Sequence, residues 1–261
     1  MLDSVPDILA RIVAHKREEL AAAPLPREEL ERLAEVQARS RRDFKAALKR
    51  EGPAILAEIK RSSPSKGVLA ADLDPARTAR AYAAGGAAAL SVLTDRAFFQ
   101  GSLEDLCAAR EAVAIPVLRK DFTIDEYHVV EAAAHGADAI LLIAAVLDAE
   151  RLRAFRELAA QFGMAALVEV HDRRELDAAV ESGAEIIGVN SRNLHNFEVR
   201  LETAIDLAPL LPADAIRVAE SGIHSAGDVR RLRQAGYDAF LVGESLMRSA
   251  DPEAALRALL S

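Results

Sequence analysis

Charged side chains close four of the short apolar runs in this sequence. Lys60, Lys120, Glu169 and Glu220 each stand at the end of such a run, and Glu58 lies two residues before Lys60. Ammonium and carboxylate groups that share one pocket can donate and accept protons during a reaction. A single charge there is as readily a solvated loop residue, but four at equivalent places favour a common site. We therefore predict acid–base chemistry at these four positions, with Glu58 one layer deeper on the face of Lys60.

Lysine is scarce in the chain, which draws attention to Lys120. Only six of the 33 basic residues are lysine, and after Lys66 the sequence uses arginine everywhere except at Lys120. Arginine keeps its proton at working pH, whereas lysine can release one when burial or a neighbouring cation lowers its pKa. We expect Lys120 to be such a proton donor, although a general bias of composition towards arginine would give the same count.

Two glycine-containing loops near the C-terminus predict a phosphate site. Ser221-Gly222 follows the seventh apolar run and Gly243-Glu244 follows the eighth, and each precedes sequence typical of a helix start. Glycine allows backbone N–H groups to approach a phosphate closely. The loop after the first run adds hydroxyl groups, among them Ser63. Glycine turns are common, but their position after the last two runs favours phosphate binding.

The elements that must position these residues form a regular series from about residue 54 onward. A short apolar run, a polar loop and an amphipathic helical stretch follow one another eight times. The strands are expected at Ala54–Lys60, Ala89–Leu93, Pro116–Lys120, Ala139–Ile143, Ala165–Val170, Glu185–Asn190, Ile216–Glu220 and Ala239–Val242. Continuous apolar character suits parallel strands that are covered on both faces.

Eight β–α units indicate an α/β fold of the (β/α)8 TIM-barrel type. Four helical stretches end in glycine just before a strand, a junction typical of a left-handed helix C-cap. An open doubly wound sheet is less suitable, because it has fewer strands and because no G-x-G-x-x-G or Walker motif occurs. Active sites of such barrels lie at the carboxyl ends of the strands, where the charges above are expected.

Residues 1–50 precede the barrel, which we assign to residues 51–261 as a single structural domain. The first fifty residues are expected to form a helical extension with helices at Pro6–Ala23 and Pro26–Arg50, separated by a Pro-Leu-Pro break. Two roles remain open for this extension. It could plug the bottom of the barrel, or it could be a flap that covers the substrate.

Composition restricts the class of protein further. The net charge of −8 gives no broad cationic surface, so we expect no nucleic-acid partner. The N-terminus lacks the pattern of a signal peptide, and the longest apolar run is about half a membrane span, so we expect a cytoplasmic protein without membrane contact. Cys107 has no second cysteine to pair with and is expected to pack in a helix. The six scattered histidines predict no metal site, and we expect no cofactor.

Several segments together resemble the indole-3-glycerol phosphate synthase family, in the family's order and over about four-fifths of the chain. They are Glu58-Ile-Lys-Arg-Ser-Ser-Pro-Ser, Leu90-Ser-Val-Leu-Thr, Phe98-Phe-Gln-Gly-Ser, Lys120-Asp-Phe, Leu141-Leu-Ile, Leu167-Val-Glu-Val-His, Asn190-Ser-Arg-Asn-Leu, Ala219-Glu-Ser-Gly-Ile and Val242-Gly-Glu-Ser-Leu-Met. The resemblance implies a carboxy-lyase of tryptophan biosynthesis. Its substrate would be a small sugar phosphate, 1-(2-carboxyphenylamino)-1-deoxyribulose 5-phosphate, which closes to an indole with loss of carbon dioxide and water.

The same resemblance implies a role for each candidate residue. Lys120 would be the general acid and Glu169 the general base. Lys60 would pair with the substrate carboxylate and could share the acid work, and the resemblance leaves the division of that work between the two lysines open. Glu58 and Glu220 would orient the lysines and substrate, Asn190 and Arg192 would lie near the anthranilate and sugar, and Phe122 would pack on the aromatic ring. Ser221 would contact the substrate, and Ser63, Gly222, Gly243 and Glu244 would bind the phosphate, with the carboxylate of Glu244 turned outward because it would repel that group.

Two rival functions stay open at this point. A lysine at a barrel strand end can also form a Schiff base with a carbonyl substrate, as in an aldolase. A catalytically silent barrel that binds a sugar phosphate is the alternative from another class. The sequence leaves the oligomeric state undetermined between a monomer and a weak homo-oligomer.

Overall fold

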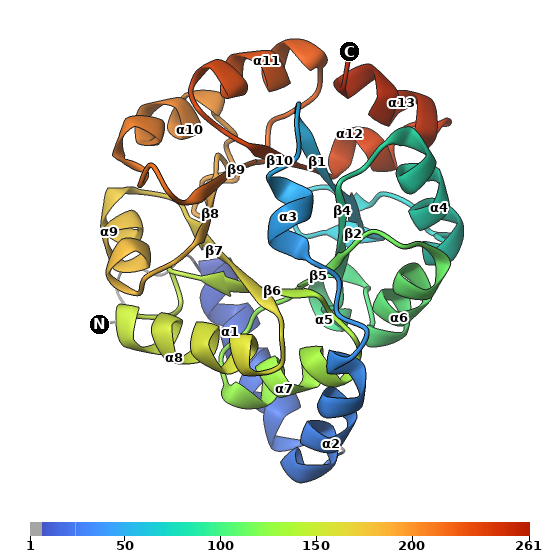
Figure 1. The fold of residues 1–261 in the computed structure, drawn as a ribbon, viewed down its shortest axis with the longest axis vertical. Helices are drawn as coiled ribbons and strands as arrows, with labels where there is room; N and C mark the ends of the chain where they lie inside the picture. The colour runs from blue at the N-terminus through green and yellow to red at the C-terminus, as the bar shows by residue number, and fades with distance from the viewer. Residues whose placement is uncertain (1–6, 24) are drawn as a thin grey trace.

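The computed structural model describes residues 7–23 and 25–261 and shows a closed barrel of eight parallel strands (Figure 1). Neighbouring strands pair in the order β1-β10-β9-β8-β7-β6-β5-β4, so the first and last strands close the ring. Their bounds are β1 Ala54–Ile59, β4 Ala89–Leu93, β5 Val117–Lys120, β6 Ala139–Ile143, β7 Ala165–Val170, β8 Ile186–Asn190, β9 Ile216–Glu220 and β10 Ala239–Val242. The predicted TIM barrel is confirmed, and three strand ends differ by one residue, so that Lys60 follows β1 instead of ending it.

An outer ring of helices covers the strands. The ring consists of α4 Pro75–Gly85, α6 Leu103–Ala112, α7 Glu126–Ala134, α8 Ala149–Gln161, α9 Arg173–Glu181, α10 Leu201–Leu207, α11 Ala226–Gln234 and α13 Pro252–Leu259. Aspartate or serine caps most of these helices by accepting a backbone N–H, as Asp148 does from Arg151 at 2.9 Å. The four predicted glycine junctions are confirmed, because Gly86, Gly136, Gly183 and Gly236 all adopt positive φ angles.

The barrel interior fixes which face of each strand can carry chemistry. Leu56, Leu118, Leu167 and Val218, from β1, β5, β7 and β9, belong to one buried cluster inside the barrel. Side chains two residues apart on a strand point the same way. The residues two positions further along these strands are Glu58, Lys120, Glu169 and Glu220. Those four charged side chains therefore stand together, directly above an apolar floor.

The N-terminal extension forms three helices in place of the predicted two: α1 Asp7–Ala21, α2 Arg27–Ala38 and α3 Phe44–Leu48. The predicted start at Pro6 and the Pro24 of the break lie outside the described residues. The prediction of a single helix over Pro26–Arg50 is wrong, because the chain turns at residues 39–43. There the Asp43 carboxylate accepts the N–H of Ala46 at 2.8 Å and starts α3. The guanidinium of Arg41 donates to the carbonyl oxygens of Phe162, Ala137 and Ala133, which fastens this turn to the barrel.

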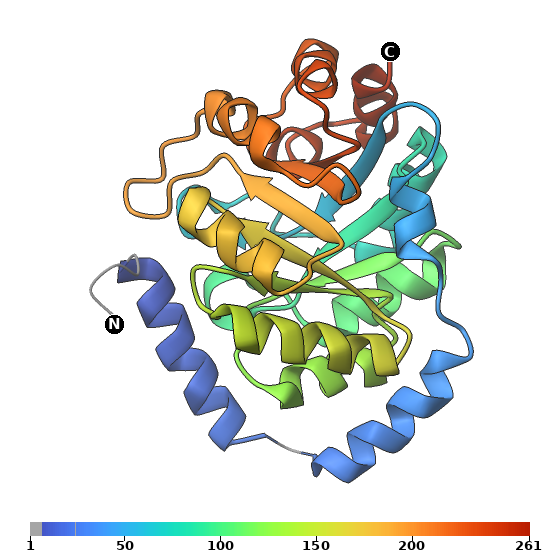
Figure 2. The ribbon, with the colours of Figure 1, turned by 60° about the vertical axis from the view of Figure 1, so that its left-hand side comes forward.

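The helices of the extension lie at both ends of the barrel. Phe44 and Leu48 of α3 are buried in the interior cluster and close the amino-terminal end. Ile8, Leu9 and Ile12 of α1 line a pocket at the opposite end, where the strands finish. Figure 2 shows the extension running along the side of the barrel between these two positions.

A buried cation fastens α1 to the barrel. Lys16 is 4% exposed, and its ammonium group lies 3.0 Å from Asp95 Oδ2 and 2.9 Å from Asp121 Oδ1. Burial would lower the pKa of Lys16, but Asp121, Asp95 and Glu19 raise it above its ordinary value. Asp121 directly follows Lys120, so the anchor of α1 and the candidate acid share one stretch of chain.

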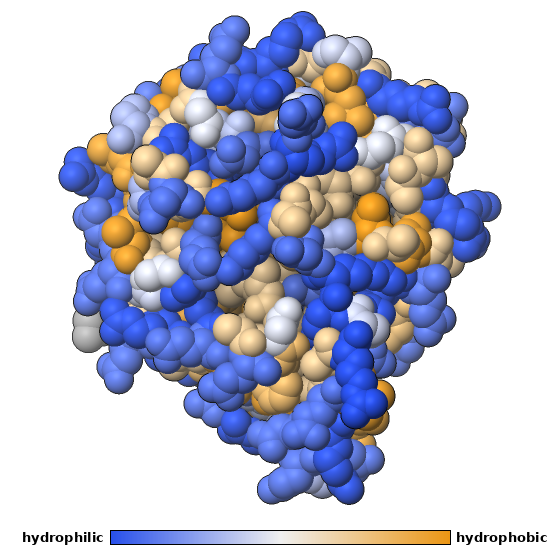
Figure 3. All heavy atoms as spheres, in the orientation of Figure 1, coloured by the Kyte–Doolittle hydropathy of each residue, from blue (hydrophilic) through white to orange (hydrophobic). Residues whose placement is uncertain are grey.

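Short elements and the surface complete the fold. The loop after β1 contains a small hairpin, β2 Ser62–Ser63 and β3 Gly67–Val68, and two short helices are α5 Arg96–Phe99 and α12 Glu244–Met247. On the face drawn in Figure 3, apolar residues show only as small areas between hydrophilic ones. Within the described residues, every helix is too short or too polar to cross a membrane.

Replacing Lys16 by methionine should destabilise the protein strongly. The substitution leaves Asp95 and Asp121 buried without their cation, which costs about 3–5 kcal/mol of unfolding free energy in comparable buried pairs. Urea denaturation of Lys16→Met measures this loss. The matched control is Lys45→Met, because Lys45 pairs with Glu185 at the surface and should contribute about 1 kcal/mol or less. Equal losses for the two variants would contradict the anchoring role of Lys16.

Candidate active site

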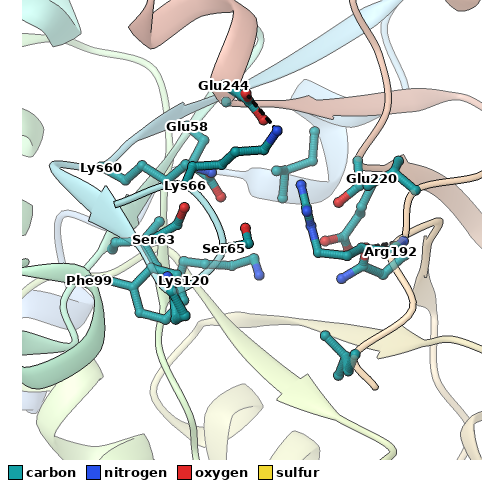
Figure 4. A pocket seen from close by; sticks show the side chains of 18 of the residues that line it. Glu58, Lys60, Ser63, Ser65, Lys66, Phe99, Lys120, Arg192, Glu220 and Glu244 are labelled. Carbon is teal, nitrogen blue, oxygen red and sulfur yellow. Dashed lines mark hydrogen bonds and ion pairs between the residues drawn. The ribbon is translucent and has the colours of Figure 1, made fainter. Parts of the chain in front are cut away.

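The residues predicted from the sequence meet in one pocket at the carboxyl ends of the strands. Its cavity volume is about 540 Å³. The pocket is lined by every candidate residue, namely Glu58, Lys60, Ser63, Lys120, Phe122, Glu169, Asn190, Arg192, Glu220, Ser221, Gly222, Gly243 and Glu244. Figure 4 shows Lys60 and Ser63 on one side of this cavity and Arg192 and Glu220 on the other, with Lys120 between them.

An ion pair between two strands forms the charged centre of the pocket. Lys120 Nζ lies 3.1 Å from Glu169 Oε2, so the ends of β5 and β7 are joined across the site. Glu169 is 3% exposed and Glu220 is 2% exposed. Burial favours the neutral form of Glu169, but Lys120 and His171 reverse that effect and lower the pKa of Glu169 below its ordinary value. Glu169 is therefore a carboxylate, able to accept a proton.

The pKa of Glu220 is shifted in the opposite direction from that of Glu169. Burial and the neighbouring carboxylate of Glu169 raise the pKa of Glu220 well above its ordinary value, and the opposing effect of Lys120 is too small to restore it. Two carboxyl groups that lie this close share one proton instead of carrying two charges. Because the pKa of Glu220 is raised and that of Glu169 is lowered, a shared proton resides preferentially on Glu220.

The state of Lys120 corrects one expectation from the sequence. Burial does lower its pKa, but Glu169, Glu220 and Glu58 together raise it above the ordinary lysine value. The expected depression is therefore wrong for the resting site, because carboxylates outnumber cations around this ammonium group. Lys120 is fully charged before substrate arrives.

Glu58 and Lys60 form a second ion pair at the end of β1. Two glycines make room for the buried carboxylates. A Cβ atom at Gly243 would collide with Glu58 Oε1, and one at Gly188 would collide with Glu220 Oε1. Glycine at position 243 therefore serves a purpose other than close approach to a phosphate: any side chain there would displace Glu58.

Asn190 and Arg192 lie where β8 ends. The side-chain oxygen of Asn190 accepts the backbone N–H of Arg192 at 3.0 Å, which turns the chain out of the strand. Arg192 then pairs with Val199 in an isolated β-bridge, so the loop folds back beside the pocket. The guanidinium of Arg192 reaches into the cavity (Figure 4).

The candidate phosphate end of the pocket contains a left-handed turn and a carboxylate, Glu244, that forms ion pairs at the rim. Ser221 and Gly222 adopt positive φ angles of 67° and 79°. Glu244 does not simply turn outward as expected. Its Oε1 lies 3.6 Å from Lys66 Nζ, its side chain is 23% exposed, and it stays at the pocket rim. Arg248 Nε lies 3.3 Å from the same oxygen, so Lys66 and Arg248 together offset the charge of a carboxylate that would repel a phosphate.

Phe99, the α1 side of the apolar wall and Lys66 were not predicted from the sequence, whereas Phe122 was. Phe99 faces Phe122 with ring centroids 6.0 Å apart, and both line the cavity together with α1. Phe99 belongs to the Phe98-Phe-Gln-Gly-Ser segment that resembles the family. That segment could have identified Phe99 as a pocket residue. Lys66 was visible in the loop after the first strand, but only the fold brings that loop next to Glu244.

Neither metal ligation nor cysteine chemistry finds support in the described part of the chain. Residues 7–23 and 25–261 contain no group of three histidine, cysteine or acidic side chains placed to hold a metal ion. Cys107 lies in α6, where burial raises the pKa of its thiol. Its Sγ lies 3.6 Å from the carbonyl oxygen of His135.

Residues 9–259 match the indole-3-glycerol phosphate synthase family. The chain belongs to this family. The indole-3-glycerol phosphate synthase of Laribacter hongkongensis is 51% identical to this chain. The alignment covers 98% of this chain and 99% of that relative. The same enzyme from Burkholderia vietnamiensis is 50% identical, with 96% of this chain and 97% of the relative covered. The activity is therefore that of the family, a carboxy-lyase reaction of tryptophan biosynthesis.

Solved structures with low sequence identity share the fold. Thiamine phosphate pyrophosphorylase from Pyrococcus furiosus superposes with a TM-score of 0.60 at 19% identity, over 81% of this chain and 95% of that chain. The N-acetylmannosamine-6-phosphate 2-epimerase from Clostridium perfringens also gives 0.60, at 14% identity over 78% of this chain and 91% of that chain. At this identity the likeness extends to the barrel alone.

The raised pKa of Glu220 predicts how stability changes with pH. A carboxyl group whose pKa is higher in the folded protein contributes stability that is complete below its ordinary value of 4.5 and is lost as pH rises through the folded value. Glu220→Gln keeps a hydrogen-bond donor towards Glu169 but cannot ionise. Its unfolding free energy should therefore fall less between about pH 5 and pH 9 than that of the unsubstituted protein.

Urea denaturation across this range, with both proteins in the same buffers, measures the difference. Parallel curves for the two proteins would show that Glu220 ionises normally.

Proposed function

We propose that the Lys60, Lys120, Glu169 and Glu220 site closes the indole ring of 1-(2-carboxyphenylamino)-1-deoxyribulose 5-phosphate. The observation that carries this proposal is the buried Lys120–Glu169 pair, 3.1 Å across the pocket of a chain that belongs to this family. It supplies one charged acid and one ionised base at the same place. A decarboxylating ring closure followed by dehydration needs both.

Substrate binding uses different groups of the pocket for the two ends of the substrate. Lys60 pairs with the carboxylate of the anthranilate moiety, and the aromatic ring packs against Phe122 and Phe99. The phosphate binds near Ser63 and the Ser221-Gly222 turn, with the backbone N–H of Glu244. This arrangement supports the proposal because the apolar wall and the rim loops line one cavity.

Ring closure requires an acid at the carbonyl oxygen. The ring carbon that bears the carboxylate attacks the C2 carbonyl, and the carbonyl electron pair moves to oxygen. Lys120 donates a proton to that oxygen, and a preorganised ammonium group stabilises the charge that develops there. The carbon–carboxylate bond then breaks, its electrons restore the aromatic ring, and carbon dioxide leaves.

Dehydration requires an acid and a base together. Lys60, which shares the acid work with Lys120, protonates the hydroxyl group, and this group leaves as water. A proton is lost from the neighbouring C1 carbon to give the pyrrole double bond. Glu169 accepts this C1 proton. Glu58 holds Lys60, the neutral Glu220 holds Glu169, and Asn190 and Arg192 orient the anthranilate and the sugar.

We also infer the organisation of the protein from these roles. Residues 1–50 are an extension of a single catalytic domain at residues 51–261, and the chain works in the cytoplasm as a monomer or weak homo-oligomer. The contribution of α1 to the pocket wall supports one functional unit. The net charge of −8 is consistent with a small-molecule substrate and no nucleic-acid partner.

Lys120→Ala should abolish most of the activity. Loss of the proposed acid removes at least about 4 kcal/mol of transition-state stabilisation, roughly a thousandfold in turnover. The assay follows indole fluorescence as purified protein converts the anilino-ribulose phosphate. Lys45→Ala, at the surface, is the matched control. Near-normal turnover by Lys120→Ala would refute the role, and borohydride trapping of substrate on Lys120 or Lys60 would favour the aldolase chemistry.

Glu169→Gln should separate catalysis from binding. Glutamine keeps the size and a hydrogen-bond acceptor for Lys120 but cannot take the C1 proton at working pH. We expect kcat to fall by about a hundredfold or more, the usual range for loss of a general base, with KM changed only modestly. Steady-state kinetics measure both constants. A rise in KM with an unchanged kcat would assign Glu169 to binding instead.

A further inference from the structure

An ion-pair cluster at the rim of the pocket has no part in the proposed proton transfers. Glu244, the first residue of α12, lies 3.6 Å from Lys66 Nζ and 3.3 Å from Arg248 Nε, and both cations meet the same oxygen, Oε1. Figure 4 shows the Lys66 side chain extended across the cavity to Glu244. Ser63 and the Ser221-Gly222 turn, where the phosphate is proposed to bind, line the same pocket.

Three cations share this one carboxylate. Burial alone would raise the pKa of Glu244, but Lys66, Arg248 and Arg192 outweigh that effect and lower the pKa below its ordinary value. Three positive charges against one negative charge leave a surplus of two, and a phosphate monoester carries a charge of about −1.5 to −2 at neutral pH. The rim therefore has the charge to accept a phosphate, and Glu244 competes with that phosphate for the same cations.

The contact between Lys66 and Glu244 is easily exchanged. At 3.6 Å it is an ion pair without a hydrogen bond, and the Lys66 side chain is 45% exposed. Exposed ion pairs of this kind contribute little free energy. In the described part of the chain, Glu244 is the only carboxylate within ion-pair distance of Lys66. A phosphate offers more charge and more acceptor oxygens than this carboxylate does, so it is the better partner for Lys66.

The loop that carries Lys66 has a fixed base and a loosely held tip. At the base, the guanidinium of Arg61 donates to Asp105 Oδ1 at 2.9 Å. At the tip, Val68 is 56% exposed, and a Cβ atom at Gly67 would meet no described atom within 4 Å. Lys66 therefore stands on a segment that can shift without disturbing packed neighbours.

The proposed reaction gives a reason to limit the affinity for phosphate. The indole product keeps the phosphate of the substrate, and binding energy that is equal before and after the reaction does not raise kcat. A phosphate site that binds too tightly delays product release, a step that limits turnover in many enzymes. A carboxylate that competes for Lys66 lowers the affinity for both molecules.

We propose that Glu244 is a positioning residue that holds Lys66 in the empty site and yields it to the phosphate of the substrate. When the product leaves, Lys66 returns to Glu244, so the carboxylate limits how tightly substrate and product are held. This inference rests on the proposed function, because that function places a phosphate at this end of the pocket.

Titration calorimetry with inorganic phosphate as the probe tests the exchange. Glu244→Gln keeps the size of the side chain and removes its charge, so it should bind phosphate about threefold or more tightly, a typical contribution of one exposed charge. Lys66→Gln should bind phosphate about threefold or more weakly. In the double variant the gain from Glu244→Gln should shrink, because no Lys66 is left to be released. The matched control is Glu202→Gln, whose carboxylate pairs with Arg231 at the surface and should not affect phosphate binding.

Steady-state kinetics separate this role from a merely structural one. Glu244→Gln should lower the inhibition constant of the indole product by about the same factor as the Kd of phosphate, because the product carries that group. Weaker or unchanged phosphate binding by Glu244→Gln would overturn the inference, since Glu244 would then support the site or take no part in it. An equal gain with and without Lys66 would also overturn it, because Glu244 would then only repel the phosphate. Absence of turnover by the unsubstituted protein would instead contradict the proposed function.

Discussion

The structure depends on placing several charged groups in one buried layer without leaving any charge uncompensated. The parallel strands of the barrel direct Glu58, Lys120, Glu169 and Glu220 to the same level above an apolar floor. Isolated charges at such a place would be strongly destabilising. The layer is tolerated because Lys120 is paired with Glu169 and because the raised pKa of Glu220 favours its neutral form. The same pairing places a charged ammonium group, Lys120, beside a carboxylate, Glu169.

The remainder of the molecule closes the barrel around that layer. At one end, Phe44 and Leu48 fill the interior below the floor. At the other, α1 lies against the pocket and is held by the ion pairs of Lys16 with Asp95 and Asp121. A single segment of chain thus packs against both ends of the interior.

Much of this arrangement was predictable from sequence because it follows from strand periodicity. Eight apolar runs indicated the barrel, and the strand ends predicted a ring of Lys60, Lys120, Glu169 and Glu220 with Glu58 one layer deeper. In the structure it is Glu58 that is level with Lys120, Glu169 and Glu220, because β1 ends one residue earlier than predicted. What could not be predicted depends on contacts between distant segments. The pKa of Lys120 reflects carboxylates from three other strands, and the pairing of Glu244 with Lys66 joins the first and last loops of the barrel. The break between α2 and α3 follows from arginine contacts with carbonyl groups of the barrel.

The central claim is that Glu169 is ionised and Glu220 is protonated in the resting site at neutral pH. Infrared difference spectroscopy between the unsubstituted protein and Glu220→Gln tests it directly, because a buried carboxylic acid has a C=O stretch distinct from that of a carboxylate. The account predicts that a carboxylic-acid band is present in the unsubstituted protein at pH 7 and missing from the variant. Loss of a carboxylate band instead, with no carboxylic-acid band in either protein, would contradict it.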